Sequence, residues 1–399
     1  MKSTASDFST LRSRLAEIQA GLKEHDLDGW LLYDLHARNP VATQLLGVGE
    51  LTRRYFVLVP AEGEPTVLMH GIETTPWAAW PWRKQTYVAW KTLDARLAEL
   101  LGGKKVATEI STNDAVPAVD MIPAGVAELL RKAGAELTAS ADLITRFYAR
   151  WTDEQAASHR RAAAVLAEVA RETFQRAAEA VGAGRPVTEG ELHGWLLARL
   201  ADRGIGTGPD AIVANGVNAA NPHYENGPDG ATLEKGDLLL IDLWSRESES
   251  AVYADQTWMG YLGSAVPEDV QRYWEAIRDA RDAAVEFLHE EWSAGRIVQG
   301  WQVDDVTRDV IRERGLDEYF IHRTGHSIDQ DVHGMGPNID NLETHETRKL
   351  IPGVGFSIEP GIYVPGEVGL RTEIDVFMSE DGPEVTTPDP QTEIFTLLP

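Results

Sequence analysis

The sequence predicts an α/β protein of two domains, and three features of the chain support this prediction. Its 399 residues include 43% hydrophobic residues, enough to bury two cores of ordinary domain size. Segments with the spacing of amphipathic helices are interspersed with short apolar runs typical of strands. The composition of the chain changes near Thr152, where an alanine-rich segment begins. We therefore expect one domain over residues 1–150 and a second over residues 151–399.

The first 150 residues have the pattern of an α/β domain. Apolar residues recur at helical spacing at Leu11, Leu15, Ile18 and Leu22. The segment DGWLLYD reads as a strand, and RRYFVLVP and EPTVLMH predict a hairpin over residues 53–70. A tryptophan-rich stretch follows, with Trp77, Trp80, Trp82 and Trp90. We favour packing or a subunit contact for these rings, and a wall that reaches into a partner subunit is the alternative.

The remaining residues repeat one pattern. Thr152 is a good N-cap for a long helix with acidic residues in its first turn. A second helix, EGELHGWLLARLADRG, is followed by the strand-like runs AIVAN and DLLLIDLW. Helices over 267–293 and 302–314 and strands from about 318 to 378 then repeat this order. The repetition predicts a pseudo-symmetric domain with a curved antiparallel sheet and helices on its outer side.

Bulk composition disfavours several classes of protein. No run approaches the ~18 apolar residues of a membrane span, and the segment MKSTASDFSTLRSRL lacks an apolar signal core. Cysteine is absent, which excludes disulfides and thiol catalysis and fits a reducing cytoplasm. A formal net charge of −26 repels nucleic acid and anionic membranes. We expect a cytoplasmic protein that binds neither.

Five acidic or imidazole side chains stand inside strand-like apolar runs of the second domain. They are Asp242, Asp255, His326, Glu359 and Glu373. Burying an ionised carboxylate without a partner is strongly unfavourable, so a chain that does this four times is expected to supply a cation. Four carboxylates and one imidazole suit a pair of divalent ions such as manganese better than a thiolate zinc site. The set predicts a two-metal hydrolase.

The two aspartates are predicted to meet on neighbouring strands. Asp242 interrupts the apolar run LLLIDLW, and Asp255 lies in the next strand, AVYADQTWMG. The polar segment SRESES between them predicts a solvated turn, so the strands can pair antiparallel. Either aspartate alone is equally consistent with a satisfied core acid. Together, on adjacent strands, they are better interpreted as metal ligands.

Histidines supply the next candidates. Gly325 allows close backbone approach beside His326, which we assign to metal. His333 falls on the opposite face of a regular strand, so a turn must intervene before it can handle substrate or protons at the same site. His322 is equally consistent with a structural role. His223, in the loop IVANGVNAANPHYENG, is a third candidate imidazole, although it could merely be exposed.

Two glutamates complete the set. Pro360 enforces a turn directly after Glu359. Arg371, Glu373 and Asp375 alternate with apolar residues, a pattern that an exposed edge strand would share. That alternative weakens because Glu359 can fold back beside Glu373. Asp375 is then a candidate partner of the ligands.

This residue set predicts hydrolysis of a peptide-like bond. Two divalent ions roughly 3.5 Å apart can share one water, lower its pKa and polarise a carbonyl. Glu359 is the candidate acceptor of the water's proton. His223 and His333 are candidates for stabilising the oxyanion or protonating the leaving amine. Arg371 either contacts a substrate carboxylate or braces the acidic ligands, and we favour the brace.

Five segments in order, IVANGVNAANPHY, DLLLIDLW with YADQT, HRTGHSIDQDVHG, GFSIEPGIY and LRTEID, resemble the M24 metallopeptidase family. The resemblance covers residues 152–399 strongly, and residues 1–150 more weakly resemble a creatinase/prolidase-type N-terminal domain. It implies a pita-bread catalytic domain whose five ligands bind two metal ions, for which we favour Mn²⁺, with Co²⁺ or Zn²⁺ as alternatives. It also implies substrate and proton handling by His223 and His333, and a role for Arg371.

The same resemblance implies a homodimeric Xaa-Pro dipeptidase that hydrolyses the bond before proline in small peptides through a metal-bridging water. An aminopeptidase P acting on longer peptides is the alternative. Creatine hydrolysis by metal-free relatives, or a binding protein on this scaffold, is disfavoured because all five ligands are present.

Three departures from the family pattern bear on specificity. The segment between the two aspartates is longer than usual, and glycine follows His333 where many relatives have glutamate. Prolidases usually carry an arginine for the dipeptide carboxylate upstream of the segment seen here as RKLIPG. This chain has NLETHET there, with His345 at the expected position. We therefore expect dipeptides to be held by other groups, with His345 as a substrate-binding candidate, or longer peptides to be accepted.

Overall fold

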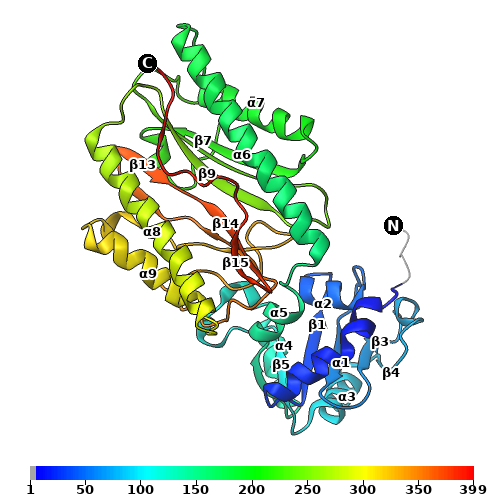
Figure 1. The fold of residues 1–399 in the computed structure, drawn as a ribbon. Coiled ribbons are helices and arrows are strands. Elements are labelled where there is room, and N and C mark those ends of the chain that lie inside the picture. The colour runs from blue at the N-terminus through cyan, green and yellow to red at the C-terminus, as the bar shows by residue number, and fades with distance from the viewer. Residues whose placement is uncertain (1–5) are drawn as a thin grey trace. The chain divides into compact units, whose positions relative to one another are not determined.

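The computed structural model describes residues 6–399 of the chain. It divides into two compact units, with the boundary between Tyr148 and Ala149. Each unit has its own sheets and its own buried core, and each is described by itself (Figure 1).

The first unit is built on a six-stranded mixed sheet with the order β4-β3-β2-β1-β5-β6. Its strands are β1 (Gly29–Asp34), β2 (Tyr55–Pro60), β3 (Thr66–His70), β4 (Arg83–Tyr87), β5 (Lys105–Thr108) and β6 (Glu136–Ala139). The β1–β2 and β2–β3 pairs are antiparallel and the other pairs are parallel. The hairpin predicted over residues 53–70 is therefore present as β2 and β3.

Helices connect these strands. They are α1 (Ser9–Glu24), α2 (Pro40–Leu46), α3 (Trp90–Leu101), α4 (Ala124–Lys132) and α5 (Ala141–Phe147), with short 3₁₀ turns at Thr75–Trp77, Thr112–Asp114 and Pro117–Val119. Trp77 is buried and stacks on Phe8 with 5.6 Å between ring centroids, and Trp80 packs edge-on against both rings. These two tryptophans serve the unit's own core, whereas Trp90 is exposed.

A buried carboxylate ties several elements of the first unit together. Glu109 follows β5 and is fully buried. It accepts hydrogen bonds from Trp30 Nε1 at 2.7 Å, from Asn39 Nδ2 at 2.8 Å and from Ser140 Oγ at 3.2 Å. Burial raises the pKa of Glu109 to about 7, although these donors favour the ionised form.

The second unit contains two helix pairs, each followed by strands. The helices are α6 (Asp153–Gly182), α7 (Glu189–Asp202), α8 (Glu268–Ser293) and α9 (Gly300–Glu313), with 3₁₀ turns at Asn218–Ala220 and Asp317–Tyr319. Thr152 caps α6 as predicted, because its hydroxyl accepts from Gln155 N–H while the Gln155 side chain accepts from Thr152 N–H. The two pairs flank the strands between them (Figure 1).

Strands of the second unit form three sheets. They are β7 (Thr207–Asn215), β8 (Leu238–Arg246), β9 (Ala254–Tyr261), β10 (Ser327–Ile328), β11 (Gly355–Ile358), β12 (Gly361–Val364), β13 (Val368–Arg371), β14 (Ile374–Ser379), β15 (Gly382–Val385) and β16 (Phe395–Thr396). Their orders are β16-β9-β8-β7, β10-β11-β14-β15 and β12-β13. Pairing is antiparallel as predicted, except that β16 runs parallel to β9.

Apolar faces of the helices cover these sheets. Residues of α6 and α7, including Leu166, Phe174 and Leu196, pack with Leu239 and Trp258 of β8 and β9 in one core cluster. Further clusters join α8 and α9 to strands of both halves. The two halves thus hold their strands rigidly, and polar residues on those strands can be placed with little freedom.

Candidate active site and metal centre

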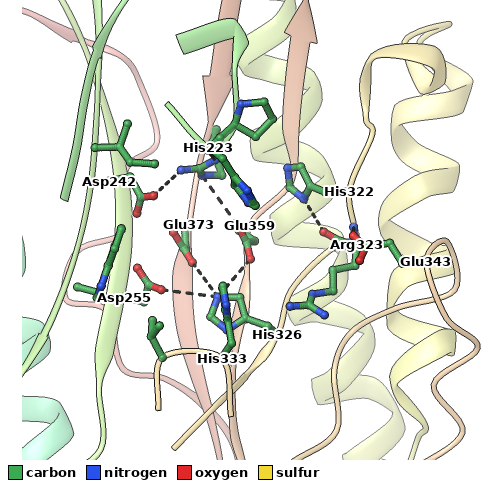
Figure 2. A pocket seen from close by; sticks show the side chains of 15 residues that line it. His223, Asp242, Asp255, His322, Arg323, His326, His333, Glu343, Glu359 and Glu373 are labelled. Atoms are coloured by element: carbon green, nitrogen blue, oxygen red, sulfur yellow. Dashed lines mark hydrogen bonds and ion pairs between the residues drawn. The ribbon is translucent and has the colours of Figure 1, made fainter. Parts of the chain in front are cut away.

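A cavity of about 370 Å³ lies among the strands of the second unit. All five predicted ligands line it, together with His223, His333 and Arg371 (Figure 2). The structure therefore brings together eight side chains that are spread over residues 223–373 of the sequence.

The strand pair β8–β9 contributes the two aspartates. In the antiparallel register Asp242 lies opposite Thr257 and Trp244 lies opposite Asp255. Both carboxylates are almost fully buried. The backbone N–H of Asp255 donates to Asp375 Oδ2 at 3.0 Å, so Asp375 fixes the strand that carries this ligand.

The pairing of β11 with β14 brings the two glutamates together. Ile358 lies opposite Ile374, so Glu359 and Glu373 leave the paired segment at the same end. Ser357 Oγ donates to Glu359 Oε1 at 3.1 Å, and Thr257 Oγ1 donates to Glu373 Oε2 at 2.8 Å. The predicted return of the chain beside Glu359 is present.

His326 faces three of these carboxylates through its Nε2 atom. The distances are 3.4 Å to Glu359 Oε1, 3.6 Å to Asp255 Oδ2 and 3.9 Å to Glu373 Oε1 (Figure 2). Its Nδ1 lies 3.2 Å from the backbone carbonyl oxygen of Ser327, which fixes the proton on Nδ1 and leaves the Nε2 lone pair free. The ring thus presents the atom that a metal ion requires.

Glycine at position 325 allows this approach. A Cβ atom there would lie 1.9 Å from the backbone oxygen of Ser357. The adjacent His326 N–H donates to Ser357 Oγ at 3.0 Å, so the histidine segment lies directly on β11. Any larger residue would force His326 away from the carboxylates.

The residues present fit divalent cations. Asp255, His326 and Glu373 each offer a ligand atom, and these atoms lie within 4.8 Å of one another. Among the described residues, the buried oxygens Asp242 Oδ1 and Asp255 Oδ1 have no hydrogen-bond partner. Such orphaned oxygens are costly unless a cation meets them. An oxygen-rich set with one imidazole suits Mn²⁺, Co²⁺ or Zn²⁺.

Burial also sets the protonation of these groups. It raises the pKa of Asp242, Asp255 and Glu373, and the neighbouring carboxylates raise all three further. Burial lowers the pKa of His326 to about 3, which keeps its imidazole neutral. A bound divalent cation would instead lower the pKa of these carboxylates, because it stabilises their ionised form.

Arg371 braces the acidic cluster from behind. Its Nη2 lies 2.5 Å from Asp242 Oδ2, its Nε donates to Thr257 Oγ1 at 3.0 Å and its Nη1 donates to Tyr363 OH at 3.0 Å. Because Thr257 in turn donates to Glu373, one buried guanidinium orients Asp242 directly and Glu373 through Thr257. The bracing role of Arg371 stays a prediction, for which these contacts supply the geometry.

The remaining predicted imidazoles flank the cavity. The rings of His333 and His326 meet edge to face with 4.4 Å between centroids. Burial lowers the pKa of His333 to about 4, and the neighbouring His326 lowers it further. His223 is exposed on its loop, where its backbone N–H donates to Asn221 Oδ1 at 3.1 Å.

Comparison with known proteins now assigns the second unit to a family. Residues 157–380, more than half of the chain, match the description of metallopeptidase family M24. The chain belongs to metallopeptidase family M24. Membership makes it a hydrolase and implies divalent metal ions. Among the residues that the structure describes, no helix has the length and apolarity needed to cross a bilayer.

Two relatives and one solved structure show how far the similarity extends. "Probable dipeptidase PepE" of Mycobacterium tuberculosis is 29% identical over 337 residues, covering 82% of this chain and 81% of the relative. An "Xaa-Pro dipeptidase" of Lactobacillus helveticus is 36% identical over 174 residues, 43% of each chain. The crystal structure of dipeptidase PepE from Mycobacterium ulcerans has a TM-score of 0.73 at 24% identity and covers 99% of this chain and 100% of that chain. This likeness confirms the predicted pita-bread fold.

The M24 site contains groups that sequence reasoning did not place there. His322 lines the cavity; its Nε2 lies 2.9 Å from Tyr363 OH and its Nδ1 lies 2.7 Å from the backbone oxygen of Arg323. Burial lowers the pKa of His322 to about 4. Its position four residues before His326 was the available signal. Arg323 and Glu343 also line the cavity, and nothing in the sequence pattern singled them out.

His345 is not brought to the M24 site. It is exposed and does not line the cavity. Its Nδ1 lies 2.8 Å from Asn341 Oδ1, and its ring packs beside Trp301 at 5.4 Å between centroids. These contacts hold it on the outer side of its loop, so its position does not support the expected contact with a substrate carboxylate.

Proposed function

We propose that this M24 metallopeptidase is a dinuclear-metal-dependent Xaa-Pro dipeptidase. The observation that carries the proposal is the convergence of four carboxylates and one neutral imidazole, with orphaned oxygens, on one cavity. A volume of about 370 Å³ lies at the small end of ligand pockets and suits a short peptide. The similarity to an Xaa-Pro dipeptidase of Lactobacillus helveticus, 36% identical over 174 residues, also supports it.

The proposed ion-binding set is Asp242, Asp255, His326, Glu359 and Glu373, with Mn²⁺ favoured and Co²⁺ or Zn²⁺ as alternatives. When bound, two such ions supply a nucleophilic water at neutral pH and polarise the scissile carbonyl. Arg371 orients Asp242 and favours its ionised form against the effect of burial, and Ser327 keeps His326 in the required tautomer.

Glu359 is proposed to accept the proton of the nucleophile. Its side chain is 13% exposed, compared with 9% or less for the other four, so it is the one most open to the cavity. His223 and His333 are proposed to stabilise the oxyanion or to protonate the leaving nitrogen of proline. A low pKa leaves the His333 ring neutral at pH 7, so it can donate one N–H without repelling a bound cation.

Apolar side chains complete the proposed substrate site. Ile212, Trp244 and Val332 line the same cavity and offer contact surface for a proline ring or an apolar residue before it.

The proposal extends to the whole chain. We propose a creatinase/prolidase-type N-terminal domain over residues 1–150 and a catalytic domain over residues 151–399. We also propose that the protein is a homodimer located in the cytoplasm.

A product assay on metal-reconstituted protein tests the proposal. Leu-Pro, Leu-Pro-Pro and Leu-Ala are compared at equal concentration. Cleavage of Leu-Pro in preference to the other two is expected from a dipeptidase. Preferred cleavage of Leu-Pro-Pro would instead identify the alternative, an aminopeptidase P, which is favoured by histidine at position 345, where an arginine is expected of a prolidase. Cleavage of Leu-Ala alone would contradict both.

A further inference from the structure

One wall of the cavity carries a guanidinium that the proposed chemistry does not use. Arg323 lines the cavity and is half-buried, three residues before His326. Figure 2 shows its side chain extending toward His326 and His333. Its backbone is held on both sides, because its N–H donates to Glu343 Oε1 at 3.1 Å and its carbonyl oxygen lies 2.7 Å from His322 Nδ1.

Within residues 6–399, no acceptor forms a hydrogen bond or ion pair with the Arg323 guanidinium. Arg371, the other arginine of the cavity, is by contrast paired with Asp242 and Thr257. The Arg323 charge nevertheless acts on the site. Burial is the main cause that lowers the pKa of both His326 and His333, and the positive charge of Arg323 lowers both further.

The bound ions would leave this charge without a partner. Two divalent cations carry the charge that balances four carboxylates, and Arg371 is held against Asp242. Glu343 is exposed, and its Oε1 is engaged by the backbone of Arg323. A half-buried guanidinium presents a planar fork of donors that matches a carboxylate. An anionic group of a substrate bound in the cavity could meet these donors.

Building on the proposed function, we propose that Arg323 binds a carboxylate of the substrate. In an Xaa-Pro dipeptide this is the C-terminal carboxylate of proline, and an acidic side chain before proline is the second possible source. The assignment supplies a carboxylate contact inside the cavity, in place of the arginine expected at position 345, where this chain has histidine. It also predicts a preference for short peptides, because an additional residue would move the carboxylate away from Arg323.

The test combines a change in the enzyme with a change in the substrate. Values of kcat/KM are measured for wild type and Arg323→Gln on Leu-Pro and Leu-Pro-amide, and on Glu-Pro and Gln-Pro. Wild type is expected to lose about 10- to 100-fold when the C-terminal carboxylate becomes an amide, as for a charged hydrogen bond. Arg323→Gln is expected to show the same loss on Leu-Pro and no further loss on the amide.

Each outcome of the test decides the inference. A preference for Glu-Pro over Gln-Pro that vanishes in Arg323→Gln, with amidation costing both proteins equally, would support the side chain as the carboxylate source. Equal discrimination by both proteins in both substrate pairs would overturn the inference. If wild type cleaves only longer peptides, the dipeptidase proposal fails, and the same comparison on Leu-Pro-Pro and its amide still tests Arg323.

Two controls separate substrate binding from structural damage. Arg323→Lys keeps the charge but loses the fork, so it should retain part of the discrimination between acid and amide. Arg296→Gln removes an exposed arginine that pairs with Glu291 away from the cavity and should leave kcat/KM unchanged. Mn²⁺ content and melting temperature should match wild type in all three variants. Loss of bound Mn²⁺ in Arg323→Gln, with unchanged discrimination per metal-loaded site, would assign Arg323 to the metal centre instead.

Discussion

Arg371 Nη2 and Asp242 Oδ2 lie 2.5 Å apart in a site where both side chains are less than 10% exposed. The pair joins β13 to β8. Arg371 also contacts Thr257 of β9, the strand that carries Asp255. Asp242 thus keeps one oxygen on the guanidinium, while its Oδ1 has no hydrogen-bond partner in the part of the chain that the structure describes. The arginine orients this carboxylate before any ion arrives.

Removing this brace should weaken metal binding. Arg371→Met leaves Asp242 buried without its cation, so we expect Mn²⁺ affinity to fall about 10- to 100-fold and stability to fall by about 3–5 kcal/mol. The Mn²⁺ affinity of Arg371→Lys should lie between those of Arg371→Met and wild type, because lysine keeps the positive charge but not the planar set of donors. Calorimetric titration with Mn²⁺ measures the effect. An unchanged affinity in Arg371→Met would show that Asp242 needs no brace.

The ligand assignment predicts a change in how metal ions stabilise the fold. Ions that bind only the folded chain raise its melting temperature. We expect Mn²⁺ to raise the melting temperature of wild type, and to have little effect on Asp255→Asn, which loses one ligand charge. Scanning fluorimetry with and without Mn²⁺ measures this difference.

Hydrolysis should be abolished in Asp255→Ala and in Glu359→Ala while both remain folded dimers. Wild-type turnover by either would refute the assignment.

Replacing His333 and replacing His326 with alanine should have different effects on bound metal and on activity. His333 borders the site but is not among the proposed ligands, so His333→Ala should keep its Mn²⁺ and lose about 10²- to 10⁴-fold in kcat. His326→Ala should lose bound Mn²⁺ together with activity. Metal analysis and steady-state kinetics on the same preparations distinguish the two. Loss of Mn²⁺ from His333→Ala would instead make His333 a ligand.

Stability of the first unit should depend on pH through Glu109. Its pKa is about 7 in the folded chain compared with an ordinary 4.5, so ionisation favours unfolding. The contribution is therefore most favourable below pH 4.5 and is lost as pH rises to 7, by about 3 kcal/mol. Glu109→Gln should remove this dependence, which denaturant unfolding at several pH values between 4 and 8 would measure. An identical pH dependence in wild type and variant would show that Glu109 does not titrate in this range.

The sequence predicted the strand positions of the site because buried charge is rare in apolar strands. Asp242 and Asp255 stand out for that reason, and the polar turn between them fixed the antiparallel pairing that β8 and β9 show. The turn at Pro360 likewise indicated the return that places Glu359 beside Glu373. In each case one short-range pattern determines a contact between neighbouring strands.

Contacts that depend on several distant elements were not predictable in this way. The role proposed for Arg323 rests on the absence, within residues 6–399, of a hydrogen-bond or ion-pair partner for its guanidinium, which only the packed structure reveals. His345 occupies the expected place in the sequence, yet its contacts with Asn341 and Trp301 hold it outside the cavity. The strand β16 has only two residues, too few to produce a periodic pattern, and its parallel pairing with β9 joins distant parts of the unit.

The central claim is that two ions held by this chain's five ligands carry out hydrolysis. We would titrate Mn²⁺ into chelator-treated protein and measure Leu-Pro hydrolysis and bound metal in the same samples. The account predicts no turnover without metal and full turnover at two ions per chain. Asp255→Asn should reach neither two bound ions per chain nor full turnover. Full turnover at one ion per chain, or turnover in the chelated protein, would contradict it.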